Sequence, residues 1–135
     1  MHLWKSIAAI VAVLFLTVQV ADAKTVRYSK TARANASTKI DHYSGWNDDC
    51  SFLTIDIDVV EKPRNGAVRP KLANGRIPRP QVGSRQGAAC AGRPMKIIEV
   101  YYTPTRGFRG NDQFKVRMRT PGQRDVFFVY RVKVN

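Results

Sequence analysis

The chain has 135 residues, of which 23 are Lys or Arg and 10 are Asp or Glu, so its formal net charge is +13. A chain of this length holds one small domain. Its positive charge favours anionic partners such as envelope glycans, anionic lipid head groups or nucleic acid, although it carries no information about the fold.

Residues 1–23 are predicted to be a secretory signal peptide. Lys5 precedes an apolar run over residues 7–20, and Ala-Asp-Ala at 21–23 is the small-x-small ending that signal peptidase reads. The run is shorter than the roughly 18–20 residues of a membrane-spanning helix, and an uncleaved membrane anchor is the competing interpretation. We therefore expect a periplasmic or secreted protein. Cleavage after residue 23 would remove one base, Lys5, and one acid, Asp22, so the remaining chain would keep 22 bases and 9 acids.

The two cysteines, Cys50 and Cys90, both follow the predicted signal peptide. An oxidising compartment allows them to form one disulfide. A metal site or a redox pair is disfavoured because there is no Cys-x-x-Cys spacing and no second ligand cluster. A bridge that closes a loop of forty residues stabilises so small a domain by about 3–4 kcal/mol. We expect no metal and no cofactor.

Residues 24–46 are polar and are predicted to be a lead-in or an edge strand, and residues 47–135 to be the folded domain. In residues 51–60, SFLTIDIDVV, apolar and polar side chains alternate, which predicts a half-buried strand. Pro63 and Asn65-Gly66 then predict a turn, followed by a short strand at Ala67-Val68 that Pro70 ends.

From Pro70 to Gly92 the chain is rich in Gly, Pro, Arg and Lys, which predicts a long exposed basic loop. The basic residues of this loop and of the turn before it form a secondary cationic group: Arg64, Arg69, Lys71, Arg76, Arg79, Arg85 and Arg93.

Three alternating segments, at residues 96–102, 113–119 and 126–134, predict further strands. No segment after the signal peptide has a sustained helical period, so the predicted fold is all-β. An antiparallel β-sandwich buries the apolar side of such strands.

Residues 102–114, YTPTRGFRGNDQF, connect two of these strands and are predicted to form a structural corner rather than an active site. Proline stops strand pairing, glycine adopts backbone angles closed to other residues, a phenylalanine can cover the end of the core, and an aspartate can accept backbone hydrogen bonds. The residues with these roles are Pro104, Gly107, Phe108, Gly110 and Asp112.

This segment resembles the end of the repeats in bacterial immunoglobulin-like and cadherin-like domains, Y-x-P-x-x-G-F-x-G-x-D-x-F. The turn at 63–68 looks like the family's P-x-x-G-x-V element, and Cys90-Ala91-Gly92 is similar to the Cys-x-Gly of small exported members. The resemblance covers residues 51–135 and implies an immunoglobulin-like sandwich with a role in adhesion or structural support. This chain departs from the family in having one copy and a basic loop.

Some relatives in that family bind calcium between repeats. Here Asp56 and Asp58 stand alone on one strand face, without the six or more oxygen ligands that calcium needs. The acids Asp48, Asp49, Glu99 and Asp112 form no spaced catalytic pair either, and His42 is a lone histidine. We therefore expect a non-catalytic protein.

The strongest functional signal is charge on the predicted C-terminal hairpin. Like charges facing each other on a sheet are destabilising unless counterions or a ligand relieve them, which predicts a site for an anionic polymer such as a glycan or lipopolysaccharide. The alternative is a structural or accessory protein whose basic face docks an acidic protein. The outward side chains that would form the site are Lys115, Arg117, Arg119, Arg131 and Lys133.

Overall fold

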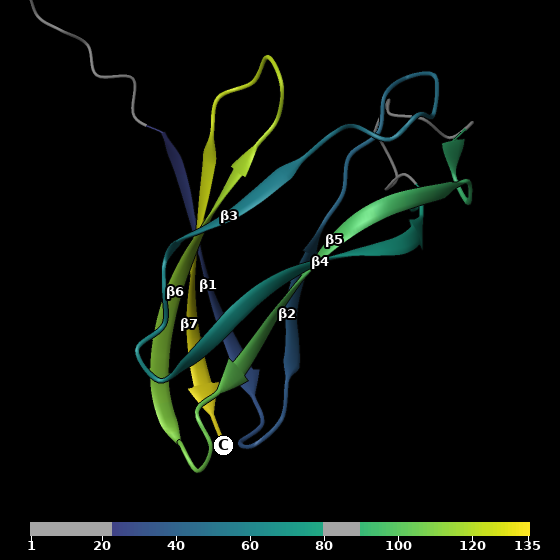
Figure 1. The fold of residues 1–135 in the computed structure, drawn as a ribbon. Helices are drawn as coiled ribbons and strands as arrows, with labels where there is room; N and C mark the ends of the chain where they lie inside the picture. Colours follow the sequence, from purple (N-terminus) through teal and green to yellow (C-terminus); the bar gives the residue numbers. More distant parts are fainter. Residues whose placement is uncertain (1–22, 80–89) are drawn as a thin grey trace, which may run out of the picture.

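The computed structural model describes residues 23–79 and 90–135, which form two packed β-sheets (Figure 1). The seven strands are β1 (Lys24–Ala32), β2 (Thr38–Tyr43), β3 (Asp56–Glu61), β4 (Gly66–Arg76), β5 (Pro94–Pro104), β6 (Gly110–Arg119) and β7 (Val126–Val134). One sheet has the order β1-β7-β6-β3 and the other β2-β5-β4. The predicted all-β sandwich is therefore confirmed.

The strand order is that of an immunoglobulin-like domain. With the strands lettered A to G along the chain, the three-stranded sheet is B-E-D and the other sheet contains C-F-G. β1 lies beside β7 and runs parallel to it, from Lys24 opposite Val126 to Ala32 opposite Val134. The sequence predicted an antiparallel sandwich; the pairing of β1 with β7 is parallel and departs from that prediction.

The main core lies between the two sheets and is rich in aromatic side chains. Tyr102, Phe114 and Tyr130 are fully buried, and the ring of Phe114 stacks on Tyr130 with centroids 5.0 Å apart and on Tyr102 at 6.2 Å. Each residue comes from a segment whose alternation predicted an inward side. Burying a large side chain of this kind stabilises the fold by roughly 1.5–3 kcal/mol.

Residues 24–46 supply one edge strand to each sheet, β1 and β2. The strand predicted at residues 51–60 begins later, at Asp56. Before it, Phe52 forms an isolated bridge with Trp46, and the N–H of Leu53 donates to the carbonyl of Gly45 at 2.8 Å. These contacts hold the start of the segment outside the ladder despite its alternating pattern.

The prediction that Pro70 ends a short strand was wrong, because β4 continues to Arg76. β4 is the edge strand of its sheet, where a proline can leave its missing N–H on the unpaired side. Arg69 and Lys71 therefore lie on a strand and not in a loop. Residue Arg85 of the predicted loop lies outside the described residues.

The predicted disulfide is present between Cys50 and Cys90, with their Cα atoms 5.3 Å apart. It belongs to a second apolar cluster, in which Ile77 and Met95 are buried and Trp46 packs against them. This cluster lies at the end of the sandwich opposite the β5–β6 corner (Figure 1). In the part of the chain described, no helix is long and apolar enough to cross a membrane.

Candidate anion-binding groove

Asp112 is the anchor of the corner. Its Oδ1 accepts the backbone N–H of Arg64 at 3.0 Å and of Gln113 at 2.9 Å, and its Oδ2 accepts the N–H of Asn65 and the hydroxyl of Tyr102, both at 2.9 Å. Burial, and then the bond to Asp112, raise the pKa of Tyr102, so its hydroxyl remains a donor. The carboxylate thus fixes the turn after β3 against the start of β6.

The other predicted corner residues surround this anchor. Pro104 is buried, and Phe108 is half-buried and packs against the main core. Gly107 has φ 79° and its N–H donates to Oδ1 of Asn35 at 2.8 Å, while Gly110 has φ 123°. Both glycines lie in the region of backbone space that other residues rarely adopt.

The five basic residues predicted as a site do share the outer face of the four-stranded sheet, but they do not form one free cationic surface. In the register of β6 and β7, Lys115 lies opposite Val129 and Arg117 opposite Phe127. The like charges therefore do not face one another directly. The direct cross-strand repulsion that led us to predict a ligand on all five residues is therefore absent.

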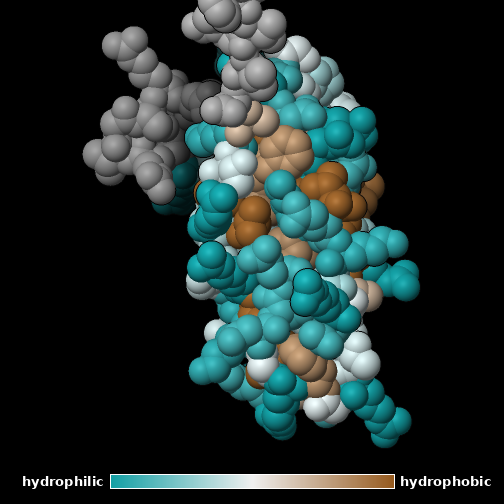
Figure 2. Space-filling view, turned by 90° about the vertical axis from the view of Figure 1, so that its left-hand side faces the viewer, coloured by the Kyte–Doolittle hydropathy of each residue, from teal (hydrophilic) through white to brown (hydrophobic). Residues whose placement is uncertain are grey.

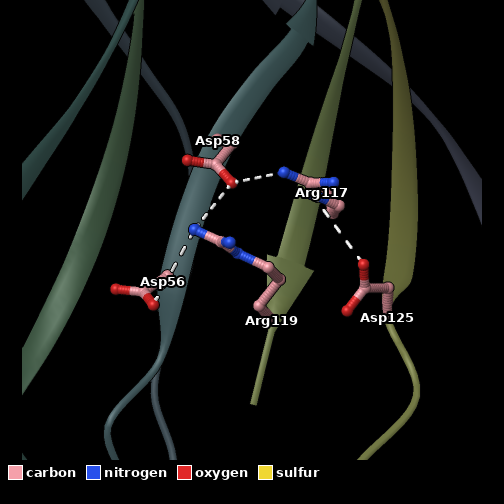
Figure 3. A network of polar contacts seen from close by, with 5 residues as sticks. All are labelled: Asp56, Asp58, Arg117, Arg119 and Asp125. Carbon is pink, nitrogen blue, oxygen red and sulfur yellow. Dashed lines mark hydrogen bonds and ion pairs between the residues drawn. The ribbon is translucent and has the colours of Figure 1, made fainter. Parts of the chain in front are cut away.

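Carboxylates from β3 neutralise the basic residues of β6. Nη2 of Arg117 lies 2.9 Å from Oδ2 of Asp58, and Nη2 of Arg119 lies 3.1 Å from the same oxygen (Figure 3). Asp56 lies 4.0 Å from Arg119, and Asp125, just before β7, lies 3.9 Å from Nε of Arg117. We call these five residues the ion-pair network.

Lys115 is also paired, because its Nζ lies 3.1 Å from Oε1 of Glu61 and 5.1 Å from the centre of the Phe127 ring. Three of the five predicted site residues are therefore engaged with carboxylates. The sequence showed the alternating acids of β3, but it did not show that β3 lies beside β6.

The other two predicted residues, Arg131 and Lys133, line an open groove of about 830 Å³ at the opposite end of the same face, which we call the cationic groove. Lys62 and Arg64, from the turn after β3, line it as well. Among the residues that the structure describes, no carboxylate lies within ion-pair distance of these four bases. The full lining is Ser29, Lys30, Glu61, Lys62, Arg64, Asn65, Asn111, Asp112, Gln113, Arg131, Val132 and Lys133.

The two acids of the lining are already occupied, Glu61 by Lys115 and Asp112 by the corner. Lys30 contributes little free charge, because its Nζ lies 3.9 Å from Asp41 and 5.4 Å from the centre of the Tyr28 ring. The groove therefore carries a local excess of positive charge. Sequence reasoning did not single out Lys62; its signal is its place immediately before the Pro63 turn.

The predicted secondary basic residues do not gather in one place. Arg64 joins the cationic groove, whereas Lys71 lies on β4 in the other sheet, with its Nζ 4.9 Å from the centre of the Tyr101 ring. Nη1 of Arg76 donates to the carbonyl of Gly92 at 2.9 Å. Arg69 and Arg79 are exposed.

A polar cluster lies between the sheets and adjoins the groove through Lys30, whose Nζ lies 3.9 Å from Oδ2 of Asp41. The hydroxyl of Tyr130 donates to Oδ2 of Asp41 at 2.7 Å and is hydrogen-bonded to the hydroxyl of Tyr43. Burial raises the pKa of both tyrosines well above the ordinary value. These hydroxyls stay protonated and satisfy one another inside the core.

Over the described ranges, no group of three or more His, Cys, Asp or Glu side chains is placed to hold a metal ion. Comparison with known proteins finds no matching family model, no similar curated protein and no similar solved structure. The fold and the groove define the class: a β-sandwich protein with one disulfide and a cationic groove on one sheet.

Proposed function

We propose that this protein is an exported, non-catalytic binding module that holds anionic polymers of the cell envelope or surface in its cationic groove. The observation that carries the proposal is the set of four bases, Lys62, Arg64, Arg131 and Lys133, which surround the groove without carboxylate partners in the described part of the chain. Charges concentrated in this way attract polyanions.

The groove is also preorganised. Arg131 and Lys133 alternate on β7, whose pleat holds both side chains on the outer face, and Asp112 fixes the turn that bears Arg64. A ligand therefore binds without first ordering the backbone, which lowers the entropic cost of association.

Two features support an exported role. The first 23 residues have the pattern of a signal peptide, and the two cysteines form a disulfide, which persists in an oxidising compartment. The resemblance of the corner and turn motifs to bacterial immunoglobulin-like and cadherin-like domains agrees with a periplasmic or secreted binding protein.

The side chains that could perform acid–base chemistry have other roles. Asp58 and Glu61 are in ion pairs, Asp112 anchors the corner, and Glu99 accepts from Lys39 at 3.0 Å and from Tyr101 at 2.8 Å. His42 is exposed on β2. These placements support a binding role over a catalytic one.

The test compares two double variants that lose the same net charge. Arg131→Gln with Lys133→Gln removes two of the four unpaired bases of the groove. Arg69→Gln with Arg79→Gln removes two exposed bases elsewhere. We expect the groove variant to bind heparin, used as a sulfated glycan probe, at least about tenfold more weakly at low salt. The control variant should lose less than about threefold.

Equal losses in the two variants would overturn the proposal, because total charge rather than a site would then set the affinity. It would also be overturned if the unmodified protein bound no polyanion at low salt but captured one acidic protein stoichiometrically at high salt. Far-UV circular dichroism and thermal unfolding of each variant establish that the fold is retained.

A further inference from the structure

We infer that the ligand of the cationic groove is an acidic saccharide, whose charged groups are separated by hydroxyl-bearing sugar units. This inference rests on the proposed function and specifies its substrate class. It comes from the order in which basic and amide side chains lie across the groove.

Side chains from three neighbouring segments line the groove. Arg131 and Lys133 on β7 form one basic row, and Lys62 and Arg64 after β3 form the other. β6 lies between β7 and β3 and contributes only uncharged amides on this part of the outer face: its Gln113 pairs with Arg131 and its Asn111 with Lys133. Since neighbouring strands are about 4.8 Å apart, β7 and β3 are separated by roughly 10 Å, and the turn that bears Lys62 and Arg64 follows directly from β3.

The amide row is available to a ligand. Gln113 and Asn111 are exposed, and within the described part of the chain their side-chain amides have no hydrogen-bond partner. An amide both donates and accepts, so it matches a sugar hydroxyl, which also does both. Facing a phosphate chain, which offers acceptors alone, the amide oxygen would lose its solvent partner without gaining a new one.

Two other classes of polyanion fit less well. Single-stranded nucleic acids bind by stacking their bases on aromatic side chains, and none of the described residues that line the groove is aromatic. The large exposed apolar side chains, such as Phe52 and Leu72, do not line the groove either. Hydrophilic residues cover most of the side shown in Figure 2, with hydrophobic residues in separate patches. This side suits a hydrated polymer better than a lipid bilayer.

The experiment uses three probes of similar charge: a heparin oligosaccharide of defined length, inorganic polyphosphate and a single-stranded DNA oligonucleotide. Asn111→Ala with Gln113→Ala leaves every charge in place. We expect the double variant to bind the oligosaccharide about tenfold more weakly, from two lost hydrogen bonds, and polyphosphate within twofold of the original. Asn111→Thr with Gln113→Thr supplies hydroxyls, which also donate and accept hydrogen bonds, and threonine suits a strand, so this variant should recover part of the oligosaccharide affinity.

The outcomes separate this inference from the proposed function. If all probes weaken equally, or none weakens, in the alanine variant while Arg131→Gln with Lys133→Gln still weakens binding, the saccharide assignment is wrong and the anion-binding groove stands. If DNA binds more tightly than the other two probes, and its affinity is the same in the alanine variant, the groove is assigned to nucleic acid instead. If the basic variant binds every probe as the original does, the proposed function itself fails.

Discussion

The two ends of the outer face of the four-stranded sheet contain the same kinds of basic side chain and differ in what lies beside them. At one end, the bases of β6 face the carboxylates of β3 in the ion-pair network. At the other end, Arg131 and Lys133 of β7 face Gln113 and Asn111. Lateral neighbours therefore decide whether a cation on a sheet is neutralised or remains free for a ligand.

The energetic consequences also differ. The partners in the network are substantially exposed, with Arg117 33% and Asp58 39% accessible, so each pair is worth only about 0–1 kcal/mol. The network cancels charge and favours the register of β3 on β6, but it adds little stability. The groove keeps its charge, and its mutual repulsion is a modest cost that an anionic ligand would relieve.

The largest expected effect removes stability without touching either end of this face. Cys50→Ser with Cys90→Ser should lower the free energy of unfolding by about 3–4 kcal/mol, because the bridge no longer restricts the unfolded chain. Chemical denaturation measures the loss. Heparin affinity, measured where the variant is still folded, should stay within twofold, since the bridge lies at the far end of the sandwich. A large drop in affinity would mean that the groove depends on the disulfide cluster.

The second largest expected effect lowers both the stability of the fold and the affinity of the groove. Asp112→Asn should lower the free energy of unfolding by about 2–3 kcal/mol. Each carboxylate oxygen of Asp112 accepts hydrogen bonds from two donors, and in the variant the amide nitrogen, which is itself a donor, would face one of these two pairs of donors. The turn bearing Lys62 and Arg64 is then released, so heparin binding should also weaken. Asp48→Asn, an exposed substitution with the same charge change, is the control. A cost below about 1 kcal/mol for Asp112→Asn would show that the corner does not depend on its anchor.

The fold was largely predictable because one-sided strands leave a period-two pattern, which is clear in β6 and β7. The early strands were harder. β1 and β2 are edge strands with few apolar residues, and the strand at 51–60 starts late because Leu53 bonds to Gly45 instead of joining a ladder. β4 passes Pro70 because a sheet edge tolerates proline, and a sequence does not say which strand is an edge.

For the candidate groove, the sequence predicted bases on the outer face of the sheet, but it did not predict which of them remain unpaired. Alternation placed Arg117 and Arg131 on the same face, as observed. What separates their roles is the adjacency of β3 to β6, a contact between residues about sixty positions apart, and no local pattern encodes it. For the same reason the sequence did not indicate Lys62. This residue lines the groove because the buried Asp112 holds the turn that follows Lys62.

The smallest expected effect tests the comparison most directly, by turning the neutralised end into a second free one. Asp58→Asn removes the carboxylate shared by Arg117 and Arg119 and should cost less than about 1 kcal/mol, since the pairs are exposed. Heparin affinity should rise about twofold to threefold, because two cations lose their closest partner while Asp56 and Asp125 remain nearby. Asp48→Asn raises the net charge equally and should change affinity less. Affinity that rises equally in both variants would mean that the ion pairs do not restrain the arginines, and a cost above about 2 kcal/mol would make the network a structural clamp.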